Sequence, residues 1–144
     1  MPQFQQHRFA MQLAQLSRAW RAELDRRLVG LGLSQARWLV LLHLARFDTP
    51  PTQRELAQSV GVEGPTLARL LDGLEAQGLV SRQAVAEDRR AKQITLSAKA
   101  QPLIEQIEAI STQLRQELFA GIDPVDLQHC QRVQERILAN LERS

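Results

Sequence analysis

The sequence contains no tyrosine, and aromatic residues make up only 4% of its 144 residues. Proteins that hold single-stranded nucleic acid stack its bases on aromatic side chains, so this composition favours duplex readout over such a platform. The single cysteine cannot form an internal disulfide. No apolar run approaches transmembrane length and no charged-then-apolar leader is seen, so we expect no membrane association and a cytoplasmic location.

Signatures of catalysis and of metal binding are also missing. The three histidines are scattered, and the sequence has no HExxH motif, no cysteine pair and no glycine-rich phosphate loop after a strand. His43 lies on a mostly apolar helix, where histidine is usually structural, and Cys130 lies on an apolar stripe, where a thiol usually acts as a small hydrophobe. We therefore expect no enzyme, no catalytic residue, no metal site and no cofactor, with redox sensing by Cys130 as a minor alternative.

The net charge of +2 is too small to indicate a nucleic-acid partner by itself. Residues 53–96 carry six basic and six acidic side chains, whereas residues 1–52 carry seven basic and three acidic ones. An electrostatic case for DNA binding must therefore depend on where the charges lie. The basic side chains that one surface could share are Arg69, Arg82, Arg89, Arg90 and Lys92, while the acids Glu55, Asp72 and Glu75 could face sideways.

The stretch 53–82 predicts two short helices that meet across a tight turn. Thr52 and Glu55 have the spacing of a capping box, which places the first helix start at the next residue. Gly61 suits the turn and Pro65 suits the first turn of the second helix. Over residues 63–77 the expected inward face is Leu67, Leu70, Leu71 and Leu74, and the expected outward face is Thr66, Arg69, Gly73 and Ala76. An ordinary helical hairpin is the alternative.

A β-hairpin is expected directly after the second helix. Residues 79–85 are typical of a strand, residues 86–91 of a charged turn, and residues 92–96 of a returning strand with Ile94 and Leu96 on one face. A charged hairpin tip alone is usually only solvated. A hairpin attached to a helix pair, with two arginines at its tip, instead predicts the wing of a winged helix-turn-helix.

Long amphipathic helices are expected on either side of this unit. One covers residues 9–31, and Ser34 can cap a second, largely buried helix that ends before the prolines at 50–51. After the hairpin, Ser97 is expected to cap a helix that ends at Gly121, and Asp123 with Pro124 to start the last one. One copy cannot cover all their apolar stripes, so we expect a homodimer, with a private three-helix bundle in a monomer as the alternative.

The sequence resembles the MarR family of bacterial transcription regulators in three runs: Leu79-Val80-Ser81-Arg82, Asp88-Arg89-Arg90 and Ile94-Thr95-Leu96-Ser97. Within that family, EGPTLARLLDGLEAQGLVSR and DRRAKQITLSAKA look closest to the SlyA branch. The resemblance runs from about Leu13 to the C-terminus. It implies a mainly α fold with a small β-hairpin, in which residues 34–96 form a winged helix-turn-helix DNA-binding unit and residues 1–33 and 97–144 are dimerisation helices of one intertwined domain.

On this reading the chain is a dimeric regulator that binds inverted repeats in double-stranded DNA, with its second helix in the major groove and its wing in a flanking minor groove. The expected DNA-binding residues are Gln53, Arg54, Pro65, Thr66, Arg69, Arg82, Asp88, Arg89 and Arg90. Arg69 suits guanine because its guanidinium forks onto two acceptors, and Arg90 is assigned to the minor groove. We expect contacts with the phosphate backbone of the DNA from Gln53, Arg54 and Arg82. The resemblance implies that Asp88 orients an arginine. The competing function is a winged-helix module for protein–protein assembly.

The resemblance also implies release from DNA by a small aromatic carboxylate bound between the dimerisation helices and the winged unit. Such a pocket needs an apolar wall and a cation, and Arg18, Trp20, Arg37 and Trp38 are residues of those types. The alternative is that the tryptophans belong to the core and the arginines are solvated.

Overall fold

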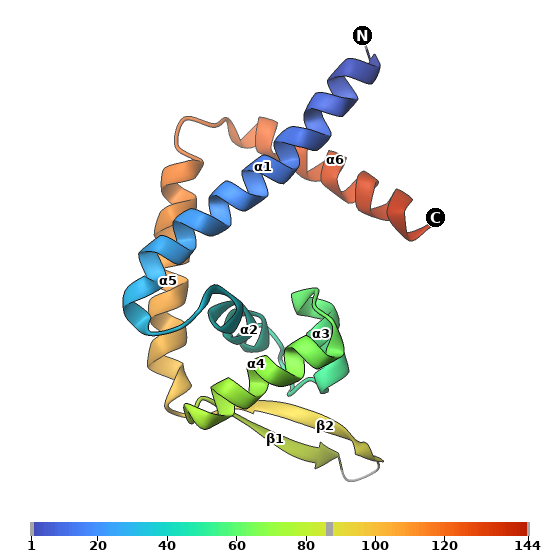
Figure 1. Ribbon diagram of the computed structural model, residues 1–144. Coiled ribbons are helices and arrows are strands. Elements are labelled where there is room, and N and C mark those ends of the chain that lie inside the picture. The colour runs from blue at the N-terminus through green and yellow to red at the C-terminus, as the bar shows by residue number, and fades with distance from the viewer. Residues whose placement is uncertain (1, 86–87, 144) are drawn as a thin grey trace. The chain divides into compact units, whose positions relative to one another are not determined.

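The computed structural model describes residues 2–85 and 88–143, together with side chains in those ranges except at positions 88–90. Helices make up most of this part of the chain, with one antiparallel hairpin between them (Figure 1). In chain order the elements are α1 (Pro2–Leu28), η1 (Val29–Leu31), α2 (Gln35–Ala45), α3 (Gln53–Val60), α4 (Gly64–Ala76), β1 (Val80–Val85), β2 (Asp88–Leu96), α5 (Ala100–Leu118) and α6 (Pro124–Glu142).

The helix pair α3–α4 forms as its sequence predicts. Thr52 Oγ1 accepts a hydrogen bond from the Glu55 amide, and the Glu55 carboxylate accepts one from the Thr52 amide, so the capping box is complete. Gly61 ends α3 in the left-handed region at φ 83°, a conformation that a residue with a Cβ resists. Pro65 lies in the first turn of α4, where its missing amide costs no hydrogen bond. The predicted helix-turn-helix is therefore confirmed.

The hairpin follows α4, but its second strand is longer than the sequence predicts. β1 and β2 pair antiparallel from Val80 opposite Leu96 to Val85 opposite Asp88, with an irregularity between Ala84 and Val85. The expected charged turn over residues 86–91 was therefore wrong at its C-terminal side, because 88–91 already belong to β2. The irregularity takes up the offset between the strands and lets pairing continue toward the tip.

The core of the helix-turn-helix lies between α2, α3, α4 and the hairpin, which are mutually packed (Figure 1). Three leucines of α4, Leu67, Leu71 and Leu74, are fully buried, whereas Leu70 is only half-buried. α2 contributes a wider buried surface, listed from its start as Trp38, Val40, Leu41, Leu42 and Leu44. The N-terminus of α3 is also tied to the wing, because the Ile94 amide donates to the Pro51 carbonyl at 2.9 Å. The wing and the two helices therefore form one packed body.

Two helix starts differ from the sequence prediction. α1 begins at Pro2 rather than near residue 9, and its last turn continues as the 3-10 turn η1. α5 begins at Ala100, and Ser97 is not its cap. The Ser97 hydroxyl instead donates to the Gly78 carbonyl at 2.6 Å, because the wing brings it beside the end of α4. Ser34 and Asp123 do cap α2 and α6 as predicted.

Residues 1–112 form one compact unit and residues 113–144 a second, with α5 running from the first into the second. In the first unit, the C-terminal half of α1 buries Leu24 and Leu28, while its N-terminal half leaves apolar side chains exposed at Phe4, Phe9, Met11, Leu13 and Leu16. In the second unit, α6 has no buried residue and exposes Val125, Val133 and Leu138.

Over the described ranges, no single helix is long and apolar enough to cross a membrane. The pair 2–31 and 35–45, bent by 93°, meets the length and composition test only when joined.

Candidate nucleic-acid interface

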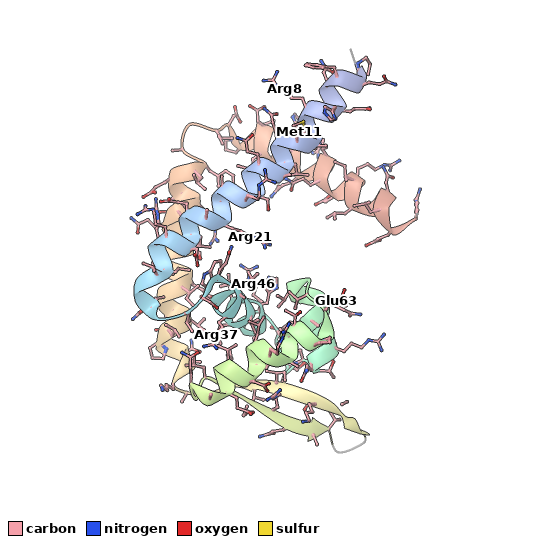
Figure 2. The ribbon with its side chains drawn as sticks, viewed as in Figure 1. Arg8, Met11, Arg21, Arg37, Arg46 and Glu63 are labelled. Atoms are coloured by element: carbon pink, nitrogen blue, oxygen red, sulfur yellow. The ribbon has the colours of Figure 1, made fainter. Side chains whose placement is uncertain are left out.

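The N-terminal half of α4 presents a small polar face to solvent. Pro65 and Arg69 are exposed on it, and Thr66 beside them is half-buried. Glu63 precedes the helix in an extended conformation, and its carboxylate makes no capping hydrogen bond (Figure 2). This half of α4 therefore carries one exposed cation and one exposed carboxylate in a slim surface that suits a DNA groove.

A groove of about 740 Å³ lies beside this face, between α3, the start of α4 and the two strands. Its lining residues are Gln53, Arg54, Ala57, Gln58, Val62, Glu63, Gly64, Ala68, Arg82 and Lys92. Three of them are cations, contributed by α3, β1 and β2 in turn. The structure thus brings Gln53, Arg54, Arg82 and Lys92 together along one groove; their contacts with DNA stay a prediction.

Arg82 is engaged within the protein. Its Nη2 lies 2.5 Å from Asp72 Oδ1 and 3.3 Å from Glu75 Oε1, and its side chain is only 17% exposed. The hydrogen bonds to Asp72 and then Glu75 raise the pKa of Arg82 above its ordinary value. Asp72 and Glu75, which were expected to face sideways, therefore both pair with Arg82, and the cluster keeps a net charge of −1. This arginine fixes β1 to α4 and pairs with two carboxylates of α4.

The wing is anchored at its base. The hydroxyls of Ser81 and Thr95 lie 2.6 Å apart across the two strands, and the Ser97 amide donates to the Leu79 carbonyl at 2.9 Å. These contacts fix where the hairpin leaves the helices. The side chains of Asp88, Arg89 and Arg90, which the sequence assigns to the wing contacts, lie outside the described residues.

Gly73 does not belong to the outward face of α4, contrary to the sequence prediction. It faces α2, and the guanidinium of Arg37 lies where a Cβ on Gly73 would be. Arg37, labelled in Figure 2, also donates from Nη1 to Gln77 Oε1 at 3.0 Å. The signal that could have shown this contact is the glycine itself, because a glycine inside a helix costs about 1 kcal/mol relative to alanine and so indicates a close approach.

The four residues expected to hold an effector lie in different environments. Arg18 is exposed and Trp20 half-buried on α1, whereas Trp38 is 1% exposed in the core. Trp38 Nε1 donates to Asp25 Oδ1 of α1 at 3.2 Å, and Arg37 is occupied by α4. The core alternative is therefore the better description of Trp38.

His43 marks a cationic region that the sequence reading did not assign. Its Nδ1 lies 2.9 Å from the Ser59 hydroxyl, which joins α2 to α3. Burial lowers the pKa of His43, and the charges of Arg46 and Arg21 lower it further. Figure 2 shows Arg21 on α1 and Arg46 at the end of α2, on the sides of these helices that face each other.

Over residues 2–85 and 88–143, no three His, Cys, Asp or Glu side chains are grouped as a metal site.

The helix pair and the hairpin have counterparts in known proteins. A model of the MarR family matches residues 31–91. A crystal structure of the transcriptional regulator PA3341 is 70% identical over 94% of this chain and 99% of that chain, with a TM-score of 0.89. The chain belongs to the MarR family of transcriptional regulators.

More distant MarR-type structures share the fold. The S. aureus MepR–DNA complex superimposes with a TM-score of 0.82 at 22% identity, covering 92% of this chain and 97% of that one. CouR from Rhodococcus jostii RHA1, bound to p-coumaroyl-CoA, does so with a TM-score of 0.79 at 23% identity, covering 90% of each chain. At these identities the likeness concerns the fold alone. It confirms the mainly α winged-helix fold of this MarR-family regulator.

Proposed function

We propose that this MarR-family regulator binds inverted-repeat operators in duplex DNA as a homodimer, with α4 in the major groove. The observation that carries the proposal is the groove beside α4, which Arg54 of α3 and Lys92 of β2 line next to a helix face that exposes Arg69. Cations that line a groove next to a slim helix suit contact with a phosphate backbone, while Arg69 suits a guanine edge. MepR, on the same fold, has been solved with DNA.

Within this proposal each predicted contact has a role. Pro65, Thr66 and Arg69 face the bases, while Gln53 and Arg54 meet the backbone beside them. Arg82 acts mainly through Asp72 and Glu75. In the wing, Arg90 keeps the predicted minor-groove role, Arg89 remains a predicted DNA contact, and Asp88 orients an arginine, as the family resemblance implies.

The homodimer is supported by the apolar side chains that the terminal helices leave exposed. Phe9, Leu13 and Leu16 on α1, and Val133 and Ile137 on α6, recur every three or four residues and are exposed to solvent. Contiguous exposed apolar surface of this kind marks interaction sites, and burying it returns roughly 25 cal/mol per Å². A second copy supplies the same surfaces by two-fold symmetry. Residues 1–33 and 97–144 then form the dimerisation part and 34–96 the DNA-binding part.

DNA binding is tested by selecting duplexes from a randomised library with the wild-type protein. The selected duplex should contain an inverted repeat whose half-site centres are about 10 base pairs apart. Affinity should fall steeply with salt, because phosphate contacts release counterions. Inserting about half a helical turn between the half-sites should abolish specific binding. A library that yields no preferred sequence would instead favour the protein–protein assembly module.

The same proposal places the regulator in the cytoplasm and makes it responsive to a small aromatic carboxylate. CouR, on this fold, has been solved with an aromatic acyl thioester. Arg18 and Trp20 remain candidates, and Arg21 and Arg46 add the cations that a carboxylate needs. p-Coumarate should release the protein from the selected duplex, and the double variant Arg21→Ala/Arg46→Ala should lose that response while binding DNA normally. Release that is unchanged in the double variant would refute this site.

Assignment to the SlyA branch is the finest level of the proposal. It depends on the wing and recognition-helix runs quoted above, since the solved SlyA structure is 21% identical to this chain. A selected operator that SlyA also binds would support that branch.

A further inference from the structure

Arg37, in the first turn of α2, lies directly on the backbone of the recognition helix. A Cβ built on Gly73 would be 2.5 Å from Cζ and 2.9 Å from Nε of Arg37, closer than real Cβ atoms approach their neighbours. Only glycine leaves room for the guanidinium there. One turn further along α4, Gln77 Oε1 accepts the 3.0 Å hydrogen bond from Arg37 Nη1.

Trp38, the residue after Arg37, fixes α2 against α1. Trp38 is buried, and its indole donates to Asp25 of α1. The Arg37 backbone is held as well, because its amide donates to the capping hydroxyl of Ser34 at 3.3 Å. The aliphatic part of the Arg37 side chain therefore starts from a fixed backbone. Its guanidinium, which contacts α4, then fixes the position of α4 relative to α2.

The other contacts at this end of α4 hold its last carbonyls. Lys99 Nζ donates to the Gln77 carbonyl at 2.9 Å, and Ser97 donates to the Gly78 carbonyl. These contacts fix where α4 ends. Arg37 instead contacts the side of α4 at Gly73, one turn before that end. A small rotation of the helix about its end would be amplified at its N-terminal half, which carries Thr66 and Arg69.

We propose that Arg37 is a positioning residue for DNA readout: seated on Gly73 and bonded to Gln77, it sets the orientation in which α4 meets the bases. Arg37 itself touches no DNA in this role. The inference rests on the proposed DNA-binding function and assigns Arg37 a task different from effector binding.

The first test is Gly73→Ala, because its effects on stability and on readout should have opposite signs. The added Cβ displaces only the tip of a flexible side chain, and alanine is preferred to glycine inside a helix, so Tm should stay equal or rise. Affinity for the selected duplex should nevertheless fall about 10-fold, the order of one impaired bidentate base contact. Affinity for random duplex should not change. Gly30→Ala is the control, since a Cβ there meets nothing within 4 Å.

The second test compares Arg37→Ala with Arg37→Lys. Lysine keeps the charge but has no planar fork to lie on the helix backbone, so both variants should lose specific affinity to a similar extent. The slope of affinity against salt should match the wild type, because a lost phosphate contact would reduce it by about one unit. The double variant Arg37→Ala/Gly73→Ala should be no worse than either single one, because both remove the same contact.

Three results would overturn the positioning role. They are wild-type specificity in both Gly73→Ala and Arg37→Ala, full rescue by Arg37→Lys, and a reduced salt slope in Arg37→Ala, which would make it a phosphate contact. The wild type, measured in the same series, distinguishes failure of the Arg37 role from failure of the DNA-binding proposal. If it prefers the selected duplex while the variants match it, only the role of Arg37 fails, whereas a wild type without preference removes the DNA-binding proposal and this role with it.

Discussion

Replacing Arg82 by methionine should weaken DNA binding through the two acids that pair with Arg82, while the winged unit stays folded. Arg82 lies within hydrogen-bonding distance of Asp72 and Glu75, whose side chains are 65% and 45% exposed. Ion pairs with partners this exposed contribute about 1 kcal/mol or less to folding. Methionine keeps the apolar stem in place. Thermal unfolding of the variant should therefore remain cooperative and only slightly earlier than that of the wild type.

The larger effect is expected on the DNA complex. Without Arg82, two carboxylates on the recognition helix face the phosphates unpaired. Two unit charges about 4 Å apart interact by about 1 kcal/mol in water, and less at greater distance and in salt, so we expect about 1 kcal/mol of repulsion per protomer. A dimer would then lose about 2 kcal/mol, roughly 30-fold in affinity. Fluorescence anisotropy with the selected duplex at 0.1 M salt measures this directly.

The decisive control neutralises the acids as well. In Arg82→Met/Asp72→Asn/Glu75→Gln the cluster carries no net charge, against −1 in the wild type and −2 in Arg82→Met, so the lost affinity should return. If Arg82 instead contacts a phosphate, removing the acids cannot replace that contact. A triple variant that binds as poorly as Arg82→Met would refute the screening role and restore Arg82 to the backbone contacts that the sequence suggested.

Three further expectations follow from named side chains. Arg69→Ala should lose about 1–3 kcal/mol of binding free energy on the selected duplex and relax the preference at one base pair per half-site, whereas Arg90→Ala should weaken binding to many sequences alike and flatten the salt dependence by about one unit per arm. Equal losses of affinity by Arg69→Ala on selected and random duplexes would contradict the placement of Arg69 at a base edge. Hydrogen bonds from Arg26 and then Arg27 lower the pKa of Glu23 from 4.5 to about 2, so this carboxylate stabilises the fold above pH 4.5 and loses that contribution as the pH falls toward 2. Carboxyl NMR should find the Glu23 pKa near its ordinary value in Arg26→Ala/Arg27→Ala, and an unchanged titration would rule out the pairing. Removing residues 2–16 should convert the dimer to monomer or aggregate in light scattering while keeping Leu24 and Leu28 in the core, and a soluble truncated dimer would exclude α1 from the interface.

Local patterns in the sequence were sufficient for most of the fold. The capping box at Thr52, the left-handed Gly61 and Pro65 at the start of α4 each act within one or two turns of helix, so their consequences can be worked out from neighbouring residues. The spacing of Leu67, Leu71 and Leu74, four and three residues apart, likewise identifies the buried face of α4, because the helical period decides which side chains share a face. The family resemblance added the role of Asp88 in orienting an arginine of the wing.

Tertiary structure decided what distant segments do to one another. The sequence placed Gly73 on the outward face, assigned Arg37 to a ligand and Arg82 to a phosphate, and gave Ser97 to a helix cap. Each depends on a partner from another element, 10 to 40 positions away: Arg37 reaches Gln77, Arg82 reaches Asp72, and the Ser97 hydroxyl reaches the Gly78 carbonyl. Periodicity fixes which face of a helix is polar, but not whether water, a carboxylate or another helix will meet it. That choice is made only when the elements pack, because long polar side chains bond to whichever partner the packing brings within about 3 Å.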